Sequence, residues 1–177
     1  MNSIMITILV KDCNYISKEL YESVINSLQL HQLECSCGHC GCLTIHGYYY
    51  RSVKNPKGTI RLRIQRVICS ECGVTHSLHL SLVVPYSRIP AADQQQIVLF
   101  YDQGKDPRDA VPESPDIDEN NIKSVLRAYR RHWRERLRSE GIRLAPVGEL
   151  IQQCFSFYSM QFMQIRRTFN KLFPGTT

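Results

Sequence analysis

The sequence lacks any hydrophobic run long enough to cross a membrane. A spanning helix needs about 20 consecutive apolar residues, and no stretch of the 177-residue chain approaches that length. The apolar amino-terminal segment also lacks a positively charged lead and a small-residue cleavage site, so we expect no secretory signal peptide. These absences argue against a membrane-embedded class and predict a cytoplasmic protein with no membrane partner.

Acidic residues are missing where basic ones gather. Residues 46–68 contain six Lys and Arg side chains and no acid, and residues 122–143 contain eight against two acids. The acids lie mainly between these segments, with seven of them in residues 102–121. The formal net charge of +6 is a weak indication by itself, but this segregation favours two basic surfaces that face an anionic partner.

Clustered cysteines are the most specific motif in the chain. Two elements share one form, Cys37-Gly-His-Cys40-Gly and Cys69-Ser-Glu-Cys72-Gly. Thiols stay reduced in the cytosol, so such clusters favour metal over disulfides there. Two tight turns can each offer two thiolates to a tetrahedral zinc ion, and the intervening hairpin has the length that brings them together. We therefore predict one structural Zn²⁺ per chain on Cys37, Cys40, Cys69 and Cys72, with no open position for catalysis.

Additional cysteines near the first turn leave more than one choice for the first pair of metal ligands. Cys35 and Cys42 flank it, so Cys37 with Cys42, or Cys35 with Cys40, are alternative pairs. The Cys37/Cys40 pair is favoured because it alone repeats the form of the second turn. Four histidines lie nearby, and we expect them to orient, pack or face solvent rather than coordinate: His39, His46, His76 and His79. A redox Cys-x-x-Cys would require a thioredoxin-like βαβ context, which the pattern lacks.

Apolar periodicity predicts an α+β fold. We expect an N-terminal strand-helix element and a β-hairpin zinc ribbon, followed by an all-α helix-turn-helix and a C-terminal amphipathic helix. The predicted strands cover residues 4–10, 43–51, 60–64 and 75–84, and the predicted helices cover 17–30, 91–103, 107–111, about 20 residues from 118, and 147–173. The corresponding units are 1–34, 35–86 (the ribbon), 87–143 (the helix-turn-helix-like domain) and 144–177.

The long helix that begins near Asp118 has a basic face. Asp118 is a favourable N-cap, and Ile117 and Ile122 occupy the two positions of a hydrophobic staple. The expected buried stripe comprises Ile122, Val125, Leu126, Tyr129, Trp133 and Leu137. Away from it, basic residues recur at three- and four-residue steps, which suits contacts to DNA phosphates. The alternative is that these basic residues only form a solvated face on a helix that mediates oligomerisation.

Individual DNA contacts follow from position along this helix. Its first turns are the part that reaches base edges in a helix-turn-helix, where Asn pairs with adenine and Arg with guanine. The ribbon adds Arg51, Arg61 and Arg63, beside three consecutive tyrosines at 48–50. On the helix, the candidate DNA-binding residues are Asn120, Asn121, Lys123, Ser124, Arg127, Arg130, Arg131, Arg134 and Arg138.

Together these motifs resemble a known family. The cysteine pairs, the His46-Gly-Tyr-Tyr-Tyr-Arg51 segment, the Arg-x-Arg-Ile-x-Arg-x-x-Cys-x-x-Cys-Gly segment and the helices after residue 87 resemble the front end of bacterial insertion-sequence transposases. They are most similar to an uncharacterised bacterial family of short, mobile-element-associated zinc-ribbon proteins. The resemblance covers roughly residues 35–141. It implies that Cys37, Cys40, Cys69 and Cys72 bind zinc and that the helix from residue 119 recognises double-stranded DNA.

The resemblance also implies where catalysis lies. In such transposases a separate RNase H-like domain with three carboxylates cuts DNA, and only 36 residues follow Gly141 here, with Glu149 as their one acid. We therefore expect no enzyme activity and no catalytic residues. The expected function is that of a transposase accessory, a transposase remnant or a regulator. A separate catalytic transposase, or a second copy bound through the C-terminal helix, is the expected protein partner. The alternative function is a protein–protein interaction module with a structural zinc ribbon.

Overall fold

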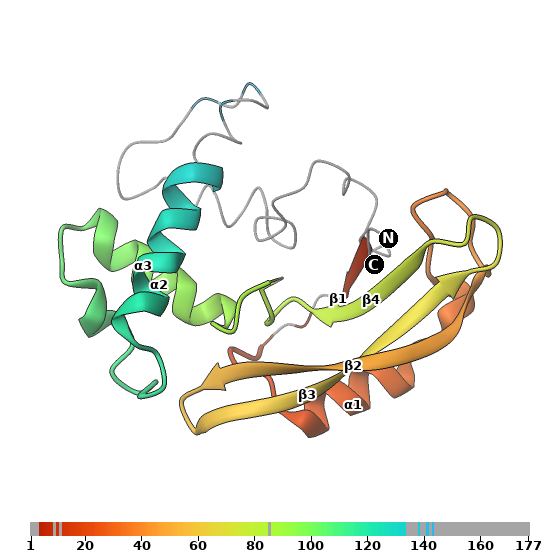
Figure 1. Cartoon of the computed structure of the whole chain (residues 1–177), viewed down its shortest axis with the longest axis horizontal. Helices are drawn as coiled ribbons and strands as arrows, with labels where there is room; N and C mark the ends of the chain where they lie inside the picture. The colour runs from red at the N-terminus through yellow and green to blue at the C-terminus, as the bar shows by residue number, and fades with distance from the viewer. Residues whose placement is uncertain are drawn as a thin grey trace.

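The chain folds around one four-stranded sheet. The computed structural model describes residues 4–8, 10, 12–84, 86–133, 138, 141 and 143. The strands are β1 (Ile4–Ile8), β2 (Leu43–Asn55), β3 (Gly58–Cys69) and β4 (Thr75–Leu80), in the order β1-β4-β3-β2. β1 runs parallel to β4 and the other neighbours are antiparallel (Figure 1). With the helices described below, this confirms the predicted α+β class.

The β2–β3 hairpin dominates the sheet. Asn55 pairs with Gly58, so Pro56 and Lys57 form the two-residue turn that the sequence predicts. Gly58 has a φ of 102°, a backbone conformation that would be strained for a residue with a side chain. The strands pair over their whole length, apart from a bulge between Ile45 and Gly47.

β1 belongs to the same sheet as the hairpin. It pairs with β4 from Ile4 opposite His76 to Ile8 opposite Leu80. Helix α1 (Lys18–Ser27), capped by the Ser17 hydroxyl, contacts β3. The N-terminal strand-helix element and the expected ribbon therefore share one sheet and its buried clusters.

Tyr21 of α1 divides the sheet. The pairing of β3 with β4 ends where Arg66 lies opposite Ser77. At the next position the buried Tyr21 hydroxyl accepts a hydrogen bond from the Gln65 N–H and donates one to the Leu78 carbonyl, both at 2.9 Å. The Tyr21 side chain thus replaces a backbone hydrogen bond between β3 and β4. Beyond this point the hairpin is no longer paired with β4.

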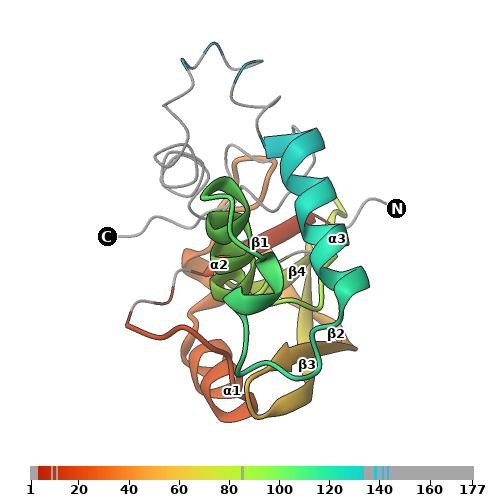
Figure 2. The ribbon, with the colours of Figure 1, turned by 90° about the vertical axis from the view of Figure 1, so that its left-hand side faces the viewer.

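The helical part has its own core. Helices α2 (Ala91–Asp102) and α3 (Glu119–Ala128) lie on either side of the 3-10 turn η2 (Pro107–Ala110), and the chain continues past α3 as a π-helical turn, Tyr129–Trp133 (Figure 2). Apolar residues of these elements form one cluster: Val84, Ile89, Ile97, Val98, Val111, Ile117, Ile122, Val125, Leu126 and Tyr129. No helix in this portion or elsewhere in the described residues is long and apolar enough to cross a bilayer.

One helix prediction needs correction. The segment at 107–111 is a single 3-10 turn, because the prolines at 112 and 115 have no N–H groups for a longer helix. The regular α-helical geometry of α3 ends at Ala128, and the helical path continues as the π-helical turn to Trp133. Asp118 is its N-cap as predicted, within a capping box. Arg134, Leu137 and residues 144–177, with their predicted helix, lie outside the described residues.

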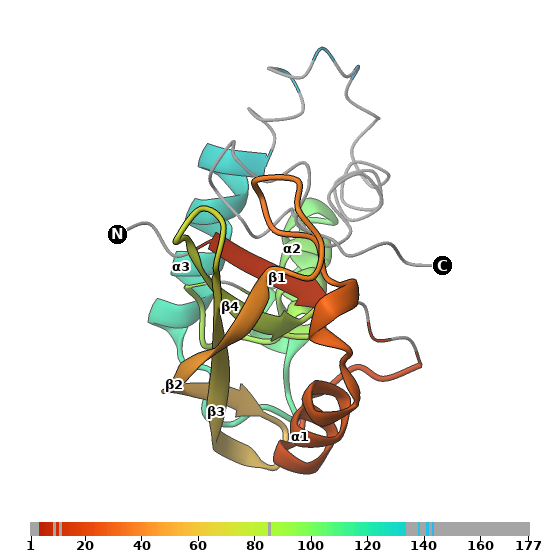
Figure 3. The ribbon, with the colours of Figure 1, turned by 90° about the vertical axis from the view of Figure 1, so that its right-hand side faces the viewer.

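The hairpin turn docks against the start of α3. The Lys54 ammonium group donates to the Asp116 carbonyl and to the Asn121 side-chain oxygen, and Thr59 donates to the Asp116 carboxylate at 2.5 Å. These contacts fix the helical part beside one end of the hairpin. Both cysteine loops lie at the other end (Figures 1 and 3).

Candidate metal centre and nucleic-acid interface

Four cysteine sulfurs gather where the loop before β2 meets the loop between β3 and β4. The Sγ atoms of Cys35, Cys37, Cys69 and Cys72 all lie within 4.8 Å of one another. The sulfurs of Cys35 and Cys72 lie 3.6 Å apart, and those of Cys37 and Cys69 lie 3.7 Å apart. Four sulfurs about 2.3 Å from one zinc ion would lie about 3.8 Å apart at the corners of a tetrahedron. The cluster therefore has the size of a four-thiolate metal site.

A disulfide framework does not fit these distances. A disulfide bond requires sulfurs about 2.05 Å apart, and these cysteines are free thiols. The sulfur cluster is thus a candidate site for one metal ion, and its all-sulfur ligand set suits zinc.

Cys35 occupies the place expected for Cys40. Cys40 forms an antiparallel bridge with Glu34 at the base of the first loop and lies outside the group of four sulfurs. Within the loop, the Cys35 N–H donates to the His39 carbonyl, and the Gly38 N–H donates to the Cys35 carbonyl. The bridge therefore places Cys35 and Cys37, not Cys37 and Cys40, opposite the second turn. Cys35 and Cys37 form a Cys-x-Cys pair. The sequence analysis did not select it, because it looked for a first pair with the Cys-x-x-Cys form of the second.

The second turn has the predicted form. The Cys72 N–H points at the Cys69 sulfur at 3.4 Å, and the Gly73 N–H donates to the Cys69 carbonyl at 3.0 Å. Gly73 has a φ of 69°, the left-handed conformation that favours glycine. The buried Cys42 lies behind the cluster, where its carbonyl accepts from the Ser70 N–H and its thiol donates to the His39 carbonyl.

Two histidines adjoin the sulfur cluster. The His39 Nδ1 atom lies 3.3 Å from the Cys37 sulfur, and the His76 Nε2 atom lies 3.2 Å from the Cys35 sulfur. The backbone and ring of His39 hold the pKa of the Cys37 thiol at about 6, well below its usual value, which favours the thiolate that zinc requires. His76 is buried, and burial lowers its pKa. Both rings are placed to hold sulfur ligands in position.

Arginine and tyrosine side chains interleave on the hairpin. The Arg63 guanidinium lies 3.9 Å from the centre of the Tyr48 ring, and that of Arg61 lies 4.2 Å from the Tyr50 ring. The two rings meet edge to face at 5.6 Å, and all four residues are exposed. Cation–π contacts hold these guanidinium groups in place without neutralising them. We refer to these four residues as the hairpin ladder.

Arg51 does not belong to the hairpin ladder. Its side chain is largely buried and donates to the carbonyls of Val84 and Ser87, where a cavity opens beside β2 and β4. Strand alternation explains the difference, because Arg51 is one residue out of phase with Tyr48 and Tyr50. The sequence analysis grouped Arg51 with Arg61 and Arg63 by charge alone.

One exposed face of α3 and of the π-helical turn after it is basic, and we refer to it as the basic face of α3. Lys123 and Arg127 lie on α3 with Asn120 and Ser124, and Arg130 and Arg131 lie on the turn. Lys123 pairs with Glu119 at 2.8 Å, and Arg130 lies over the Tyr101 ring at 4.8 Å. Within the described residues, no carboxylate pairs with Arg127, Arg130 or Arg131. Arg138 is exposed as well.

Asn121 has a different environment from its neighbours. Its side-chain oxygen accepts from the Lys54 ammonium at 2.6 Å and from the Asp118 N–H at 3.3 Å. Asn121 therefore anchors the start of α3 to the hairpin, and its oxygen is already engaged. The sequence placed it among the base-reading residues because position along a helix does not reveal a tertiary contact.

No family model, curated protein or solved structure matches the chain. The similarity to transposase zinc-ribbon proteins therefore stays a prediction that depends on the residues alone.

Proposed function

We propose that the chain is a DNA-binding protein of transposase-accessory, transposase-remnant or regulator type, in which the sulfur cluster holds one structural zinc ion. In this proposal Cys35, Cys37, Cys69 and Cys72 are the ligands. Four thiolates complete the tetrahedron, so the metal stabilises the two loops and supplies no site for a reactive water. Any DNA cleavage is assigned to a separate catalytic transposase.

The basic face of α3 is the observation that carries the DNA-binding proposal. Three neighbouring guanidinium groups, Arg127, Arg130 and Arg131, have no acidic partner among the described residues. Like charges this close repel one another unless an anion joins them, and the regularly spaced phosphates of DNA are such anions. α3 is accordingly proposed as the DNA-reading helix of a helix-turn-helix-like unit. Asn120, Ser124 and Arg127 are its proposed base contacts.

The hairpin ladder supports the same partner. Its guanidinium groups can contact phosphates while its tyrosine rings offer apolar faces to sugars or bases. The Lys54 and Asn121 contact fixes the hairpin turn beside the start of α3, so the two basic surfaces belong to adjoining elements.

The test is a salt titration of binding to duplex DNA with matched arginine variants. Replacing Arg127 and Arg131 with Ala removes two unpaired charges from the basic face of α3. Binding should weaken, and the slope of log affinity against log salt should fall by about one unit for each lost contact. Arg108→Ala is the control, because Arg108 is exposed in the same helical part but is paired with Asp106 at 2.6 Å.

The same experiment separates the alternative. If the chain is a protein–protein interaction module, the double variant and the Arg108 control should bind DNA equally weakly and with the same salt slope. That result would contradict the DNA-binding proposal. Zinc content, measured on both variants, shows whether the ribbon remains intact.

A further inference from the structure

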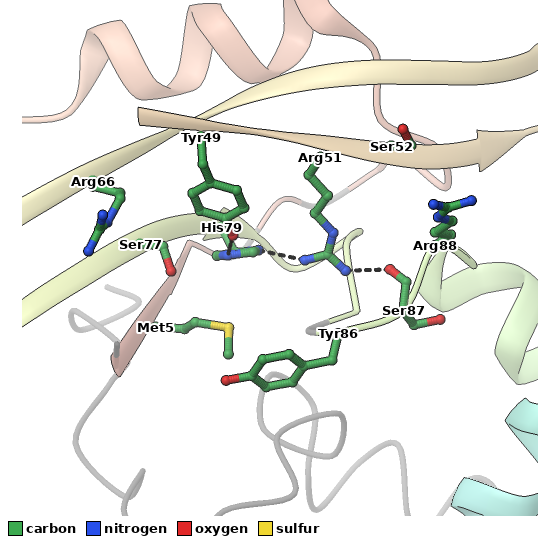
Figure 4. A pocket seen from close by; sticks show the side chains of 10 residues that line it. All are labelled: Met5, Tyr49, Arg51, Ser52, Arg66, Ser77, His79, Tyr86, Ser87 and Arg88. Atoms are coloured by element: carbon green, nitrogen blue, oxygen red, sulfur yellow. Dashed lines mark hydrogen bonds between the residues drawn. The ribbon is translucent and has the colours of Figure 1, made fainter. Parts of the chain in front are cut away.

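A cavity of about 470 Å³ lies where β2 and β4 meet the loop after residue 84 (Figure 4). This volume is within the range of about 300–1,000 Å³ that is usual for small-molecule sites. Three arginines, three serines, two tyrosines, one histidine and one methionine line it, and no carboxylate does: Met5, Tyr49, Arg51, Ser52, Arg66, Ser77, His79, Tyr86, Ser87 and Arg88.

Arg51 is the buried charge of this cavity. It donates to the backbone carbonyls of Val84 and Ser87, and its Nη1 atom lies 3.3 Å from Nδ1 of His79. All three partners are neutral, since burial, with a smaller contribution from Arg51, lowers the pKa of His79 to about 3. Within the described residues no acid pairs with Arg51. A buried positive charge without a counter-charge is costly, and a bound anion would relieve that cost.

Hydrogen-bond direction strengthens the argument. A guanidinium group only donates, so Nδ1 of His79 must be the acceptor, and the proton of the neutral ring lies on Nε2. Nε2 therefore donates to the Tyr49 hydroxyl oxygen, 3.1 Å away. The Tyr49 hydroxyl proton then points away from His79. The cavity thus combines hydroxyl donors with the guanidinium groups of Arg66 and Arg88.

Tyr86 lies at the rim of the cavity. Figure 4 shows its ring and Met5 on one side, with Tyr49 and His79 on the other. The ring is 72% exposed. Tyr86 also has a φ of 61°, a left-handed conformation that is uncommon for residues other than glycine. The loop therefore holds an exposed aromatic face beside a cluster of cationic groups.

We propose that this cavity binds the phosphate group of a small phosphorylated molecule. Arg51 and Arg88, at one end of the cavity in Figure 4, would hold the phosphate oxygens, as guanidinium groups do elsewhere, and Arg66 lies at the other end. The Tyr86 and Met5 side chains would cover part of the organic group attached to the phosphate. This site is separate from the basic face of α3 and does not depend on the DNA-binding proposal.

The test is calorimetric titration of the full zinc-loaded chain with adenosine monophosphate, with adenosine as the control ligand. Adenosine monophosphate should bind and adenosine should not. Arg88→Gln should weaken binding about tenfold or more, as expected for the loss of a charge-assisted hydrogen bond, and Arg66→Gln, at the other end of the cavity, should weaken it less. Arg108→Gln, outside the cavity, should leave it unchanged. Arg51 is left intact because its guanidinium group also holds the Val84–Ser87 loop.

Three results would overturn the proposal. These are no binding of adenosine monophosphate, equal binding of adenosine, or binding that Arg88→Gln leaves unchanged. The phosphates of DNA are the other source of the same chemistry. If Arg66→Gln weakens duplex DNA binding tenfold while adenosine monophosphate does not bind, the cavity belongs to a DNA path instead. Circular dichroism and zinc content verify that each variant is folded.

Discussion

At the scale of single residues, each cysteine near the sulfur cluster has its own expected effect on zinc binding. Structural zinc sites bind with roughly 10–16 kcal/mol, so one of four ligands accounts for about 3 kcal/mol, or more than 100-fold in affinity. Cys35→Ser should therefore lose zinc, whereas Cys40→Ser should keep it, because Cys40 lies outside the cluster. Competition with a chromogenic chelator measures both affinities. The reverse order would restore the Cys37/Cys40 pair that the sequence favours.

His76 is expected to hold the Cys35 sulfur in place. Its Nε2 atom lies 3.2 Å from that sulfur, and its Nδ1 atom has no hydrogen-bond partner among the described residues. Residues that orient metal ligands typically contribute 10–100-fold to metal affinity. His76→Phe should lower zinc affinity by that factor while one zinc per chain still binds at saturation. His46→Phe, at an exposed position on β2, is the matched control, and equal affinities for the two variants would refute the role of His76.

At the scale of elements, we expect two neighbours at the start of α3 to differ in role, Asn121 in folding and Asn120 in the proposed DNA binding. Asn121→Ala removes half of the capping box and the Lys54 contact, so the free energy of unfolding should fall by about 1 kcal/mol. Asn120→Ala, on an exposed neighbour, should leave stability unchanged and weaken DNA binding instead. Urea denaturation and DNA titration of both variants test this division. It fails if Asn121→Ala is fully stable and loses sequence preference.

The junction of α1 with the sheet gives a second element-scale prediction. Tyr21→Phe leaves the Gln65 N–H and the Leu78 carbonyl without their partner at a buried position. Leaving buried polar groups unpaired costs about 1–3 kcal/mol, so the urea midpoint should fall by that equivalent with an unchanged m-value. Tyr50→Phe is the control, because Tyr50 is exposed on the hairpin ladder. A Tyr21→Phe variant as stable as the parent would show that β3 and β4 close without the hydroxyl.

Local patterns predicted the elements better than their partners. The alternation of Ile60, Leu62 and Ile64 with arginines and the Asn-Pro-Lys-Gly turn predicted the hairpin, and Asp118 predicted the start of α3. The parallel pairing of β1 with β4 joins residues about 70 apart, and no local pattern encodes it. The hydrogen bonds of the Tyr21 hydroxyl to β3 and β4 also join residues far apart in the sequence, so no local pattern predicts them either.

For the candidate site too, local patterns predicted the motifs but not the long-range contacts. Two Cys-x-x-Cys turns predicted that the loops converge, and the described sulfur cluster agrees with that. Which cysteines converge depends on the Glu34–Cys40 bridge, a backbone pairing that spacing alone does not specify. Arg51 and Asn121 were assigned by charge and position, whereas their contacts with the Val84–Ser87 loop and Lys54 exist only in the folded chain.

At the scale of the whole molecule, stability should depend on zinc concentration. The cysteine loops pack within the cluster formed by Ile6, Leu43 and Val67, so a metal that binds only the folded loops stabilises the sheet. Free zinc at 1,000 times the dissociation constant should add about 4 kcal/mol to the free energy of unfolding. The melting temperature of the parent should rise with zinc and fall with a chelator, measured by calorimetry.

The cysteine variants provide the controls for that experiment. Cys69→Ser should melt at a temperature that does not respond to zinc. Cys13→Ser should respond like the parent, because its sulfur donates to the Tyr15 carbonyl away from the cluster. A metal-free parent that melts cooperatively at the zinc-loaded temperature would exclude a structural metal.

The sulfur cluster also bears on how quickly the chain folds. It joins Cys35 to Cys72 across 37 positions and thereby encloses the entire hairpin. Bringing ends this far apart together costs about 3 kcal/mol of chain entropy. Zinc that binds the two cysteine loops as soon as they come together would offset that entropy cost before the strands pair. Refolding started with zinc present should then be faster than refolding in which zinc is added last, and the order of addition becomes a kinetic variable.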